Sequence, residues 1–240
     1  STEGKISFLQ LWRCFIDPRL MNRYVILVAG GKGTRMLGSL PKQFLLLHGE
    51  AILVHTLRRF TLPGVQIIVV MNPDFIDYWE DQCKVLFDIP KHQLVAGGQS
   101  RAQSVANGLK LVPENSLVAI HDAVRPLSST ALINRLFDAC EKEGSAVPVI
   151  KCKDSLRMIS SDGSKAVSRE DYRSVQTPQV FKSNEIKKAF VTIDVESFTD
   201  EASIYEAAGH KVHLVEGEES NIKITVPSDI QIASALLDVK

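Results

Sequence analysis

Residues 24–36, YVILVAGGKGTRM, decide the class of fold. Residues 24–28 are apolar or aromatic and rich in Val and Ile, so they predict a strand that is buried on both faces. Three glycines follow at once, Gly30, Gly31 and Gly33, and they let the backbone approach a ligand closely. A buried strand that runs into a glycine-rich loop indicates an α/β protein with a ligand site after that strand.

The rest of the chain repeats this alternation of short apolar runs and longer amphipathic ones. Further buried strands are predicted at residues 67–71, 117–120 and 146–150, and a later one at 211–215. Amphipathic segments predict helices at residues 52–60, 75–86, 101–111, 129–143, about 201–208 and 228–237. This order implies right-handed crossovers, so the predicted fold is α/β, with a mostly parallel twisted sheet and helices on both faces.

The composition is that of an ordinary globular protein and excludes several classes. The chain has 240 residues, 45% of them hydrophobic and 23% charged, which is enough for one large α/β domain. Because 28 Lys and Arg residues balance 28 Asp and Glu residues, no overall basic field predicts nucleic acid or a membrane surface as partner. No apolar stretch approaches the roughly 18 residues of a membrane span. Any cluster of cations must therefore serve a local purpose.

The cysteines and the first residues bear on location. The cysteines are scattered and form no C-x-x-C pair, so reduced thiols and a cytoplasmic location are expected; they are Cys14, Cys83, Cys140 and Cys152. The apolar patch within residues 1–20 is too short and too interrupted for a signal peptide, and Met21 directly precedes the first predicted strand. We therefore expect residues 1–20 to be a non-native or upstream-translated extension and residues 21–240 to form one domain.

Residues 151–175 break the alternation of strands and helices. They are polar, and Asp162 and Gly163 lie at their centre. An Asp-Gly pair between β-prone flanks predicts a hairpin. Such a ribbon has no apolar face to pack on its own sheet, and an isolated two-stranded ribbon is marginally stable in water. We predict a β-arm that leaves the domain and packs against a second copy of the chain.

The glycine-rich loop predicts a phosphate site. Its backbone N–H groups can form a nest for phosphate oxygens, and Arg35 and Lys42 follow, which favours a polyphosphate over a neutral ligand. The loop is not the dinucleotide fingerprint, because Met36 stands where the third glycine belongs. It is not a Walker A loop either, because Ser39 follows Gly38. A dinucleotide-dependent oxidoreductase is therefore disfavoured. If the glycines are considered without the two cations, a plain turn after the strand remains an alternative interpretation.

A second glycine motif precedes a predicted helix. Gly97 and Gly98 stand before Ser100 and Gln103, which fit the S-x-x-Q capping box, and Ser104 would lie in the first turn of the helix. The glycine pair leaves backbone donors and acceptors open, enough to bind the edge of a base. Ordinary helix capping is the structural alternative.

A third motif, H-D-A-V-R-P, ends the predicted strand at 117–120. Ligands of open parallel sheets bind at the carboxyl ends of strands, which places Asp122 at a site. An ion pair between Asp122 and Arg125 is the structural alternative. His121 is expected to pack in the core rather than to act in catalysis.

Polar groups farther along the chain complete the candidate set. They lie at residues 168–169, 176–179 and 199–201, and Lys223 interrupts an otherwise apolar, β-type run at 221–225. Lys223 is a candidate anion ligand, with a solvated lysine as the alternative. The sequence contains no Ser–His–Asp or Cys–His set that would indicate an enzyme with a nucleophilic side chain. Phosphoryl and nucleotidyl transfers instead need positioning and charge neutralisation.

In chain order, these motifs resemble the 2-C-methyl-D-erythritol 4-phosphate cytidylyltransferase family of the non-mevalonate isoprenoid pathway. The resemblance spans residues 23–240 and rests on A-G-G-K-G-T-R-M, L-P-K-Q-F, G-G-x-x-R-x-x-S-V, H-D-A-V-R-P, Q-T-P-Q, T-D-E-A-S and V-E-G…N-I-K-I-T-V-P. It implies a Rossmann-like nucleotidyltransferase fold, a homodimer formed by exchanged β-arms, and Mg²⁺ as cofactor. The implied reaction joins CTP to a small polyol phosphate, methylerythritol phosphate, and releases pyrophosphate.

The resemblance also implies a role for each matching residue. The catalytic cations would be Arg35 and Lys42 at the triphosphate, with Lys223 and the partner's Arg169 at the attacking phosphate. CTP would be bound by Ala29, Gly30, Gly31, Gly33, Gly98, Gln99 and Ser104. The alcohol would be held by Asp122, Ala123, Thr177 and Thr199, with the partner's Arg125 and the partner's Ser155. The metal ligands stay unassigned, with Mg²⁺ held mainly by the triphosphate.

Two positions depart from the family pattern and leave alternatives open. Gln99 stands where an acid is common in the family. This weakens a side-chain role in binding CTP at this position, whereas a backbone contact would persist. Val124 replaces Ala in H-D-A-A-R-P, and the valine form also occurs in related ribitol-5-phosphate enzymes, so ribitol 5-phosphate is the alternative substrate. The string at 199–202, T-D-E-A, favours methylerythritol phosphate. A non-catalytic nucleotide-binding module is a third possibility, and the four cations argue against it.

Charge balance supports in-line attack of the substrate phosphate on the α-phosphorus. CTP brings about four negative charges and a phosphate monoester about two, so their encounter is repulsive without compensation. Mg²⁺ and the four cations named above about balance that charge. The attacking phosphate is ionised near neutrality, with a second pKa of about 6, so no general base is required.

Overall fold

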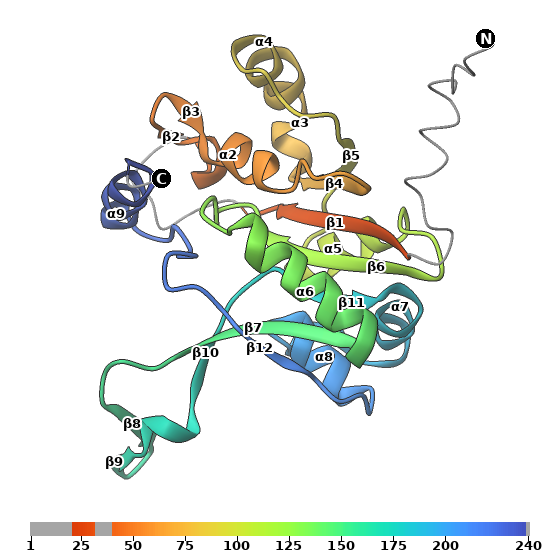
Figure 1. The fold of residues 1–240 in the computed structure, drawn as a ribbon. Coiled ribbons are helices and arrows are strands. Elements are labelled where there is room, and N and C mark those ends of the chain that lie inside the picture. The colour runs from red at the N-terminus through yellow and green to blue at the C-terminus, as the bar shows by residue number, and fades with distance from the viewer. Residues whose placement is uncertain (1–20, 32–39, 239–240) are drawn as a thin grey trace, which may run out of the picture.

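The computed structural model describes residues 21–31 and 40–238. The expected extension at residues 1–20 lies outside the described residues, and so do Gly33 and Arg35. A continuous sheet runs through the molecule in the order β10-β7-β11-β6-β1-β4-β5, and β12 pairs with β7 (Figure 1). Its strands are β1 (Asn22–Ala29), β4 (Val65–Met71), β5 (Gln93–Ala96), β6 (Ser116–Asp122), β7 (Ser145–Lys151), β10 (Arg173–Val175), β11 (Gln179–Lys182) and β12 (Leu214–Glu216).

The sheet is mostly parallel at its centre and mixed at one side. The pairs β1–β4, β1–β6, β4–β5 and β7–β12 are parallel. Strand β11, which the periodicity did not indicate, lies antiparallel between β6 and β7. The four predicted buried strands are confirmed as β1, β4, β6 and β7. The strand predicted at 211–215 is confirmed only in part, because β12 begins at Leu214.

Helices cover both faces, as predicted, and Figure 1 shows α6 in front of the sheet and α5 on its far side. Their bounds are α2 (Ile52–Arg59), α5 (Arg101–Leu109), α6 (Thr130–Glu143), α7 (Ser183–Thr192), α8 (Glu201–Ala207) and α9 (Pro227–Asp238). The predicted helix at 75–86 is a run of short turns: η2 (Pro73–Phe75), α3 (Ile76–Tyr78), the π-helical η3 (Trp79–Cys83) and α4 (Lys84–Leu86). No helix among the described residues could cross a membrane.

The side chains of β1 alternate between two cores. Val25 and Leu27 pack on one face with residues of α2 and α6, whereas Tyr24 and Ile26 pack on the other with residues of α5, α7 and α8. This alternation is the period of two that a strand imposes, and burial on both faces explains the uninterrupted apolar run. The central strands are therefore held rigidly, and the loops after them start from fixed points.

A third, smaller core joins the C-terminal helix to the first half of the chain. It contains Leu47, Ile52, Leu127, Ile224 and Ala233. Leu47 belongs to a short hairpin of β2 (Leu46–Leu47) and β3 (Glu50–Ala51), and Ala233 lies on α9. This packing brings the segment around Ile224 close to the loops that follow the central strands.

The predicted arm is a hairpin of β8 (Leu156–Ser160) and β9 (Gly163–Val167), paired antiparallel with Ser160 opposite Gly163. It forms a two-stranded sheet of its own and projects from the body at the lower left of Figure 1. Most of its residues are exposed in the single chain. The hairpin is thus confirmed, and its packing on a second copy stays a prediction.

Candidate active site

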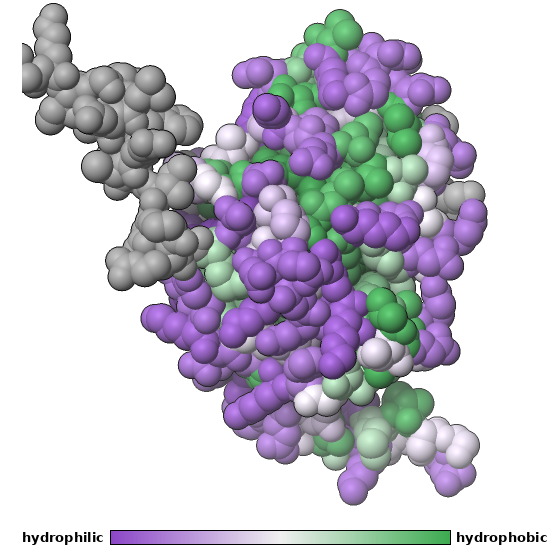
Figure 2. All heavy atoms as spheres, turned by 90° about the vertical axis from the view of Figure 1, so that its right-hand side faces the viewer, coloured by the Kyte–Doolittle hydropathy of each residue, from purple (hydrophilic) through white to green (hydrophobic). Residues whose placement is uncertain are grey.

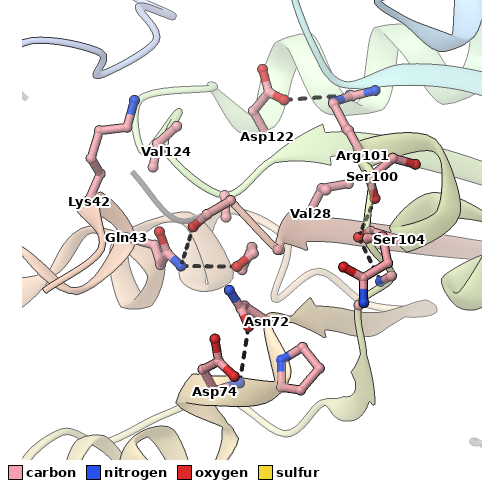
Figure 3. A pocket seen from close by; sticks show the side chains of 18 of the residues that line it. Val28, Lys42, Gln43, Asn72, Asp74, Ser100, Arg101, Ser104, Asp122 and Val124 are labelled. Atoms are coloured by element: carbon pink, nitrogen blue, oxygen red, sulfur yellow. Dashed lines mark hydrogen bonds and ion pairs between the residues drawn. The ribbon is translucent and has the colours of Figure 1, made fainter. Parts of the chain in front are cut away.

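A cavity of about 540 Å³ opens where β1, β4 and β6 end (Figure 3). Its walls come from five segments distant in sequence, together with Lys223. The segments are residues 28–31, 42–43, 72–74, 97–101 with Ser104, and 122–124. The position agrees with the rule that ligands of open α/β sheets bind at the carboxyl ends of the strands. Ten of the predicted site residues line it: Ala29, Gly30, Gly31, Lys42, Gly98, Gln99, Ser104, Asp122, Ala123 and Lys223.

Ser104 joins the two glycine loops on one wall of the cavity. Its hydroxyl accepts a hydrogen bond from the Gly98 N–H at 3.1 Å and donates to the Ser100 carbonyl at 2.8 Å. A Cβ at Gly30 would lie 2.9 Å from the Ser104 Oγ, and a Cβ at Gly97 3.0 Å from it. Glycines are required here because a side chain would push the loops apart.

The start of α5 forms half of the predicted capping box. The Ser100 hydroxyl accepts from the Gln103 N–H at 3.0 Å, as expected. In a complete capping box, the Gln103 side chain would accept from the N–H of Ser100. Here it accepts from the Gln99 N–H at 3.0 Å, one residue earlier. The shift closes the loop over Gly98, where a Cβ would lie 2.4 Å from the Gln103 Cβ.

Lys42 enters the cavity from the short helical turn η1 (Lys42–Phe44). Its neighbour Gln43 is 4% exposed and donates hydrogen bonds to the carbonyls of Ala29 at 3.0 Å and Gly31 at 3.5 Å (Figure 3). Buried side-chain amides must find such partners, so this contact ties the lysine turn to the glycine loop. Gln43 was not among the predicted site residues, although it stands within the L-P-K-Q-F string.

Asp122 lies at the centre of a cationic cluster. Its carboxylate is 3.0 Å from the Lys223 Nζ, 3.4 Å from the Arg125 Nε and 3.5 Å from an Arg101 nitrogen. Burial by itself would raise the pKa of Asp122, but the charges of Lys223, Arg101 and Arg125 outweigh it and hold the pKa well below its usual range. Asp122 is therefore a carboxylate at neutral pH. It both forms the ion pair with Arg125 and lines the cavity, so the two alternatives for Asp122 hold together.

His121 packs in the core, as predicted. Its ring lies 4.9 Å from that of Phe60, and Nε2 is 3.1 Å from the Arg125 carbonyl. Because a carbonyl only accepts, Nε2 carries the proton, and Nδ1 accepts from the Thr177 hydroxyl at 3.0 Å. Burial lowers the pKa of His121 to about 4. The histidine is thus neutral and structural.

Thr177 and Arg125 are buried supports of the Asp122 loop. The Thr177 Oγ1 accepts from the Asp122 N–H at 3.1 Å, and the Arg125 Nη1 donates to the Asn221 carbonyl at 2.8 Å. Neither residue lines the cavity, and both are less than a tenth exposed. Arg125 was expected to reach a partner's substrate, whereas the structure places it beside Asp122 of its own chain, where buried acceptors hold its guanidinium.

Lys223 is exposed, while Asn221 before it and Ile224 after it are buried. The Asn221 side chain donates to the Thr177 carbonyl at 2.9 Å, and the Ile224 N–H donates to the Val124 carbonyl at 2.9 Å. A β-type run was expected at residues 221–225, but the described structure has no strand there. These two hydrogen bonds fix the segment instead of strand pairing. Lys223 pairs with Asp122 while 42% of its side chain stays open to the cavity and solvent.

Besides Thr177 and Arg125, three further predicted residues lie away from the cavity lining in the single chain. Ser155 and Arg169 are exposed and flank the arm, and the Arg169 guanidinium donates to the Lys153 carbonyl at 2.5 Å. Thr199 is exposed and precedes Asp200, the N-cap of α8. Because the arm residues are expected to serve a second copy, their contacts with a substrate stay predictions.

The cavity also contains polar residues that the sequence analysis did not select. Asn72 and Asp74 follow β4, and the Asn72 side chain accepts from the Asp74 N–H at 3.0 Å. Arg101 begins α5 and reaches Asp122. The rule that placed Asp122 after its strand also applies to Asn72, because β4 lies next to β1 and ends at the same edge of the sheet.

Comparison with known proteins supports the resemblance found in the sequence. The family model of 2-C-methyl-D-erythritol 4-phosphate cytidylyltransferase matches residues 23–239. Curated relatives with that name, from Bacteroides fragilis and Bacteroides thetaiotaomicron, are 45% and 43% identical over 220 and 219 residues. Each alignment covers 90% of this chain and 100% of the relative.

Solved structures give the same result for the fold. The chain is similar to 4-diphosphocytidyl-2C-methyl-D-erythritol synthase from Anaerococcus prevotii, with 28% identity, a TM-score of 0.78 and coverage of 91% of this chain and 96% of that chain. It is also similar to 2-C-methyl-D-erythritol 4-phosphate cytidylyltransferase from Thermus thermophilus, with 31% identity, a TM-score of 0.73 and coverage of 91% and 100%. This chain therefore belongs to the 2-C-methyl-D-erythritol 4-phosphate cytidylyltransferase family.

Proposed function

We propose that this protein transfers the cytidylyl group of CTP to 2-C-methyl-D-erythritol 4-phosphate and releases pyrophosphate. Family membership supports this reaction over transfer to ribitol 5-phosphate. The observation that carries the proposal is the convergence of the glycine loop, Lys42 and the Asp122–Lys223 pair on one cavity. A phosphate-binding loop and two separate lysines are what a site for two phosphorylated substrates requires.

The two sides of the cavity differ in chemistry, which assigns one substrate to each. The side built from the glycine loops and Ser104 offers backbone groups at close range and suits the nucleotide. The opposite side offers the Lys223 ammonium, whose partner Asp122 is 8% exposed. The exposed cation faces incoming ligands while the carboxylate stays buried, so this side suits the attacking phosphate.

The reaction needs little covalent help from the protein. An oxygen of the ionised substrate phosphate attacks the α-phosphorus of CTP, a new P–O bond forms, and the bond to the pyrophosphate oxygen breaks. Lys42 neutralises charge on the triphosphate, and Lys223 orients the attacking phosphate. Positioning and electrostatic stabilisation supply the rate enhancement in this scheme, and no side chain serves as nucleophile or general base.

Magnesium fits this site as a partner of the triphosphate. The described residues hold no group of three or more carboxylate, His or Cys ligands, and Asp122 is already engaged by three cations. The exposed Asp74 is the other carboxylate at the cavity. Mg²⁺ is commonly bound by one or two carboxylates and substrate phosphates, so we assign it to the triphosphate with Asp74 as the protein group nearby. It would neutralise phosphate charge there.

The arm supports a homodimer in this proposal. Its exposed side chains include Met158, 53% exposed, and Ile159, 76% exposed, and some green, apolar atoms lie among white and purple ones at the lowest part of the molecule in Figure 2. A two-stranded ribbon with exposed apolar side chains gains stability by packing on another surface. Exchange of arms between two chains would bury these residues and carry the partner's Arg169 toward the cavity.

We propose a cytoplasmic location, which the cysteines of the described residues support. Cys83, Cys140 and Cys152 are free in the described structure, which agrees with a reducing compartment. We therefore assign the enzyme to the cytoplasm.

Pyrophosphate release tests the proposed reaction. Purified protein is incubated with CTP, Mg²⁺ and either 2-C-methyl-D-erythritol 4-phosphate or ribitol 5-phosphate. Rapid release with the first alcohol alone is expected, and Lys42→Ala should lower kcat by about 10²-fold, the cost of one lost transition-state donor. Lys84→Ala, which changes an exposed lysine on α4, is the matched control. Faster turnover of ribitol 5-phosphate would contradict the substrate, and absence of turnover with both would contradict the function.

A further inference from the structure

Arg101 connects three segments that the proposed reaction uses. It is the first residue of α5, directly after the loop that carries Gly98 and Gln99. Its guanidinium makes a two-pronged contact with Glu201, in which Nη1 pairs with Oε1 and Nη2 lies 3.1 Å from Oε2. The same Nη2 lies 3.5 Å from the Asp122 Oδ1 (Figure 3). One side chain thus joins the nucleotide loop, the end of β6 and the start of α8.

Glu201 is held firmly and has no exposure to solvent. It follows Asp200, whose side chain accepts from the Ser203 N–H at 3.1 Å and from the Gln179 Nε2 at 2.9 Å. Gln179 in turn accepts from the Ala202 N–H at 2.9 Å. Because Gln179 lies on β11, the start of α8 is fixed to the central sheet, and Glu201 offers Arg101 a rigid anchor.

The cluster assigns each oxygen of Asp122 to a different partner. Oδ1 faces Arg101, whereas Oδ2 faces Arg125 and Lys223. The cluster contains three cations, Arg101, Arg125 and Lys223, and two carboxylates, Asp122 and Glu201, so its net charge is one positive. Lys223 has the most exposed side chain of the three cations. Without Arg101, one oxygen of Asp122 would lose its partner, and the carboxylate could turn and draw Lys223 away from the cavity.

We propose that Arg101 is a positioning residue for the alcohol phosphate. Anchored by Glu201, it sets the orientation of Asp122 and thereby the place of the Lys223 ammonium. The proposal rests on the proposed function, because it concerns the same two-substrate site. It also explains why a buried acid stands close to Thr199, at the start of α8: the acid holds the arginine that orients the cluster.

Kinetics of three variants separate positioning from simple stabilisation. Arg101→Gln removes the link, and Arg101→Gln combined with Glu201→Gln removes it without leaving a buried unpaired carboxylate. Arg58→Gln is the matched control, because Arg58 also makes a two-pronged ion pair, with Glu50, outside the cavity lining. For each, we would measure KM for methylerythritol phosphate, kcat, CTP affinity by calorimetry, and Tm.

Arg101→Gln should raise KM for methylerythritol phosphate by about tenfold or more, since small displacements of a positioned group are costly. Its CTP affinity should stay within about twofold of wild type, and its Tm should fall because Glu201 loses its buried partner. The double variant should recover Tm and keep the high KM. The control should match wild type in KM.

Three results would overturn the proposal. The first is an unchanged KM in the single or the double variant. The second is recovery of KM together with Tm in the double variant, which would make the pair merely structural. The third is a loss of CTP affinity as large as the rise in KM, which would place Arg101 on the nucleotide side. Should the single variant fail to fold, the double variant decides. Absence of turnover in the wild type would refute the proposed function instead.

Discussion

Adjacent residues on β6 show how finely position controls role. His121 and Asp122 point to opposite faces of the strand, as successive residues do. His121 faces Phe60 in the core and stays neutral, whereas Asp122 faces the cavity and stays charged. Both groups depart from their ordinary pKa, one through burial and the other through the surrounding cations, so both make stability depend on pH.

These two shifts predict loss of stability on acidification. Unfolded histidine binds a proton near pH 6.5 but buried His121 only near 4, so folding becomes less favourable as pH falls from about 6.5 to about 4, by about 3 kcal/mol in total. Asp122 has a lowered folded pKa, so its contribution is present above about pH 4 and lost below it. Urea unfolding at pH 7.5, 6 and 4.5 measures the first effect.

His121→Asn provides the comparison for this pH dependence. Asparagine does not titrate, so the variant should be less stable at pH 7.5 and show a flatter loss between pH 6.5 and 4. An identical slope in wild type and variant would contradict the assignment. In NMR, the His121 ring should keep its neutral shifts down to about pH 5.

Secondary-structure elements supply the loops, and the start of α5 is the most constrained of them. Gln103 and Ser104 turn their side chains back onto the preceding loop, where they accept from the N–H groups of Gln99 and Gly98, whereas the Ser100 hydroxyl caps the Gln103 N–H. The loop therefore closes tightly around Gly98 and keeps its backbone toward the cavity. A helix start of this kind both caps the helix and shapes a ligand surface.

Gly98→Ala should disrupt this element. The new Cβ would lie 2.4 Å from the Gln103 Cβ and 3.2 Å from the Gln103 carbonyl carbon, so the loop must move. We expect CTP affinity to fall by about tenfold or more, with a smaller effect on overall stability, as for other overpacked sites. Calorimetry and thermal unfolding give the two quantities.

Gly31→Ala, in the other glycine loop after β1, is the comparison for Gly98→Ala, because a Cβ at Gly31 meets nothing within 4 Å. Its Tm should stay within about 2 °C of wild type, which corresponds to less than about 1 kcal/mol in a protein of this size. Equal CTP affinity in wild type and Gly98→Ala would show that the loop adapts without cost.

At the scale of the whole molecule, the site draws on segments from β1 to residue 223, and the arm lies away from the cavity of its own chain. Two routes could supply the arm's Arg169 to a site: the chain's own arm or a partner's arm. The exposed apolar residues of the arm favour the partner. The routes differ in which pairs of defective chains can rescue one another.

Mixing Lys42→Ala and Arg169→Ala chains tests the exchange of arms. If Arg169 acts across the dimer, each mixed dimer holds one intact site, with Lys42 from one chain and Arg169 from the other. Random assortment makes half of the dimers mixed, so activity should return to about a quarter of wild type after refolding together, a counting result that rests on closed two-fold pairing. Each variant refolded alone is the control. No recovery would contradict action across the dimer.

Much of the fold could be predicted from sequence, and the omission of β11 has a physical cause. The strands β1, β4, β6 and β7 are buried and carry uninterrupted apolar runs, so periodicity finds them. Strand β11 is four residues long and contains Gln179 and Lys182, and α7 was missed beside it. Gln179 is buried because α8 supplies partners for its amide, and that neighbour is unknown before the chain folds.

The chain's own order of residues determined the α/β class, the glycine loop, the hairpin of the arm and the place of Asp122 after its strand. Each depends on local geometry: the period of two in a strand, the freedom of glycine and the turn of Asp-Gly. Only the tertiary structure decided that Gln43 ties the lysine turn to the glycine loop and that Arg101 and Glu201 brace Asp122. These contacts join residues 12 to 100 positions apart, and side-chain pairing over such separations is set by how the elements pack.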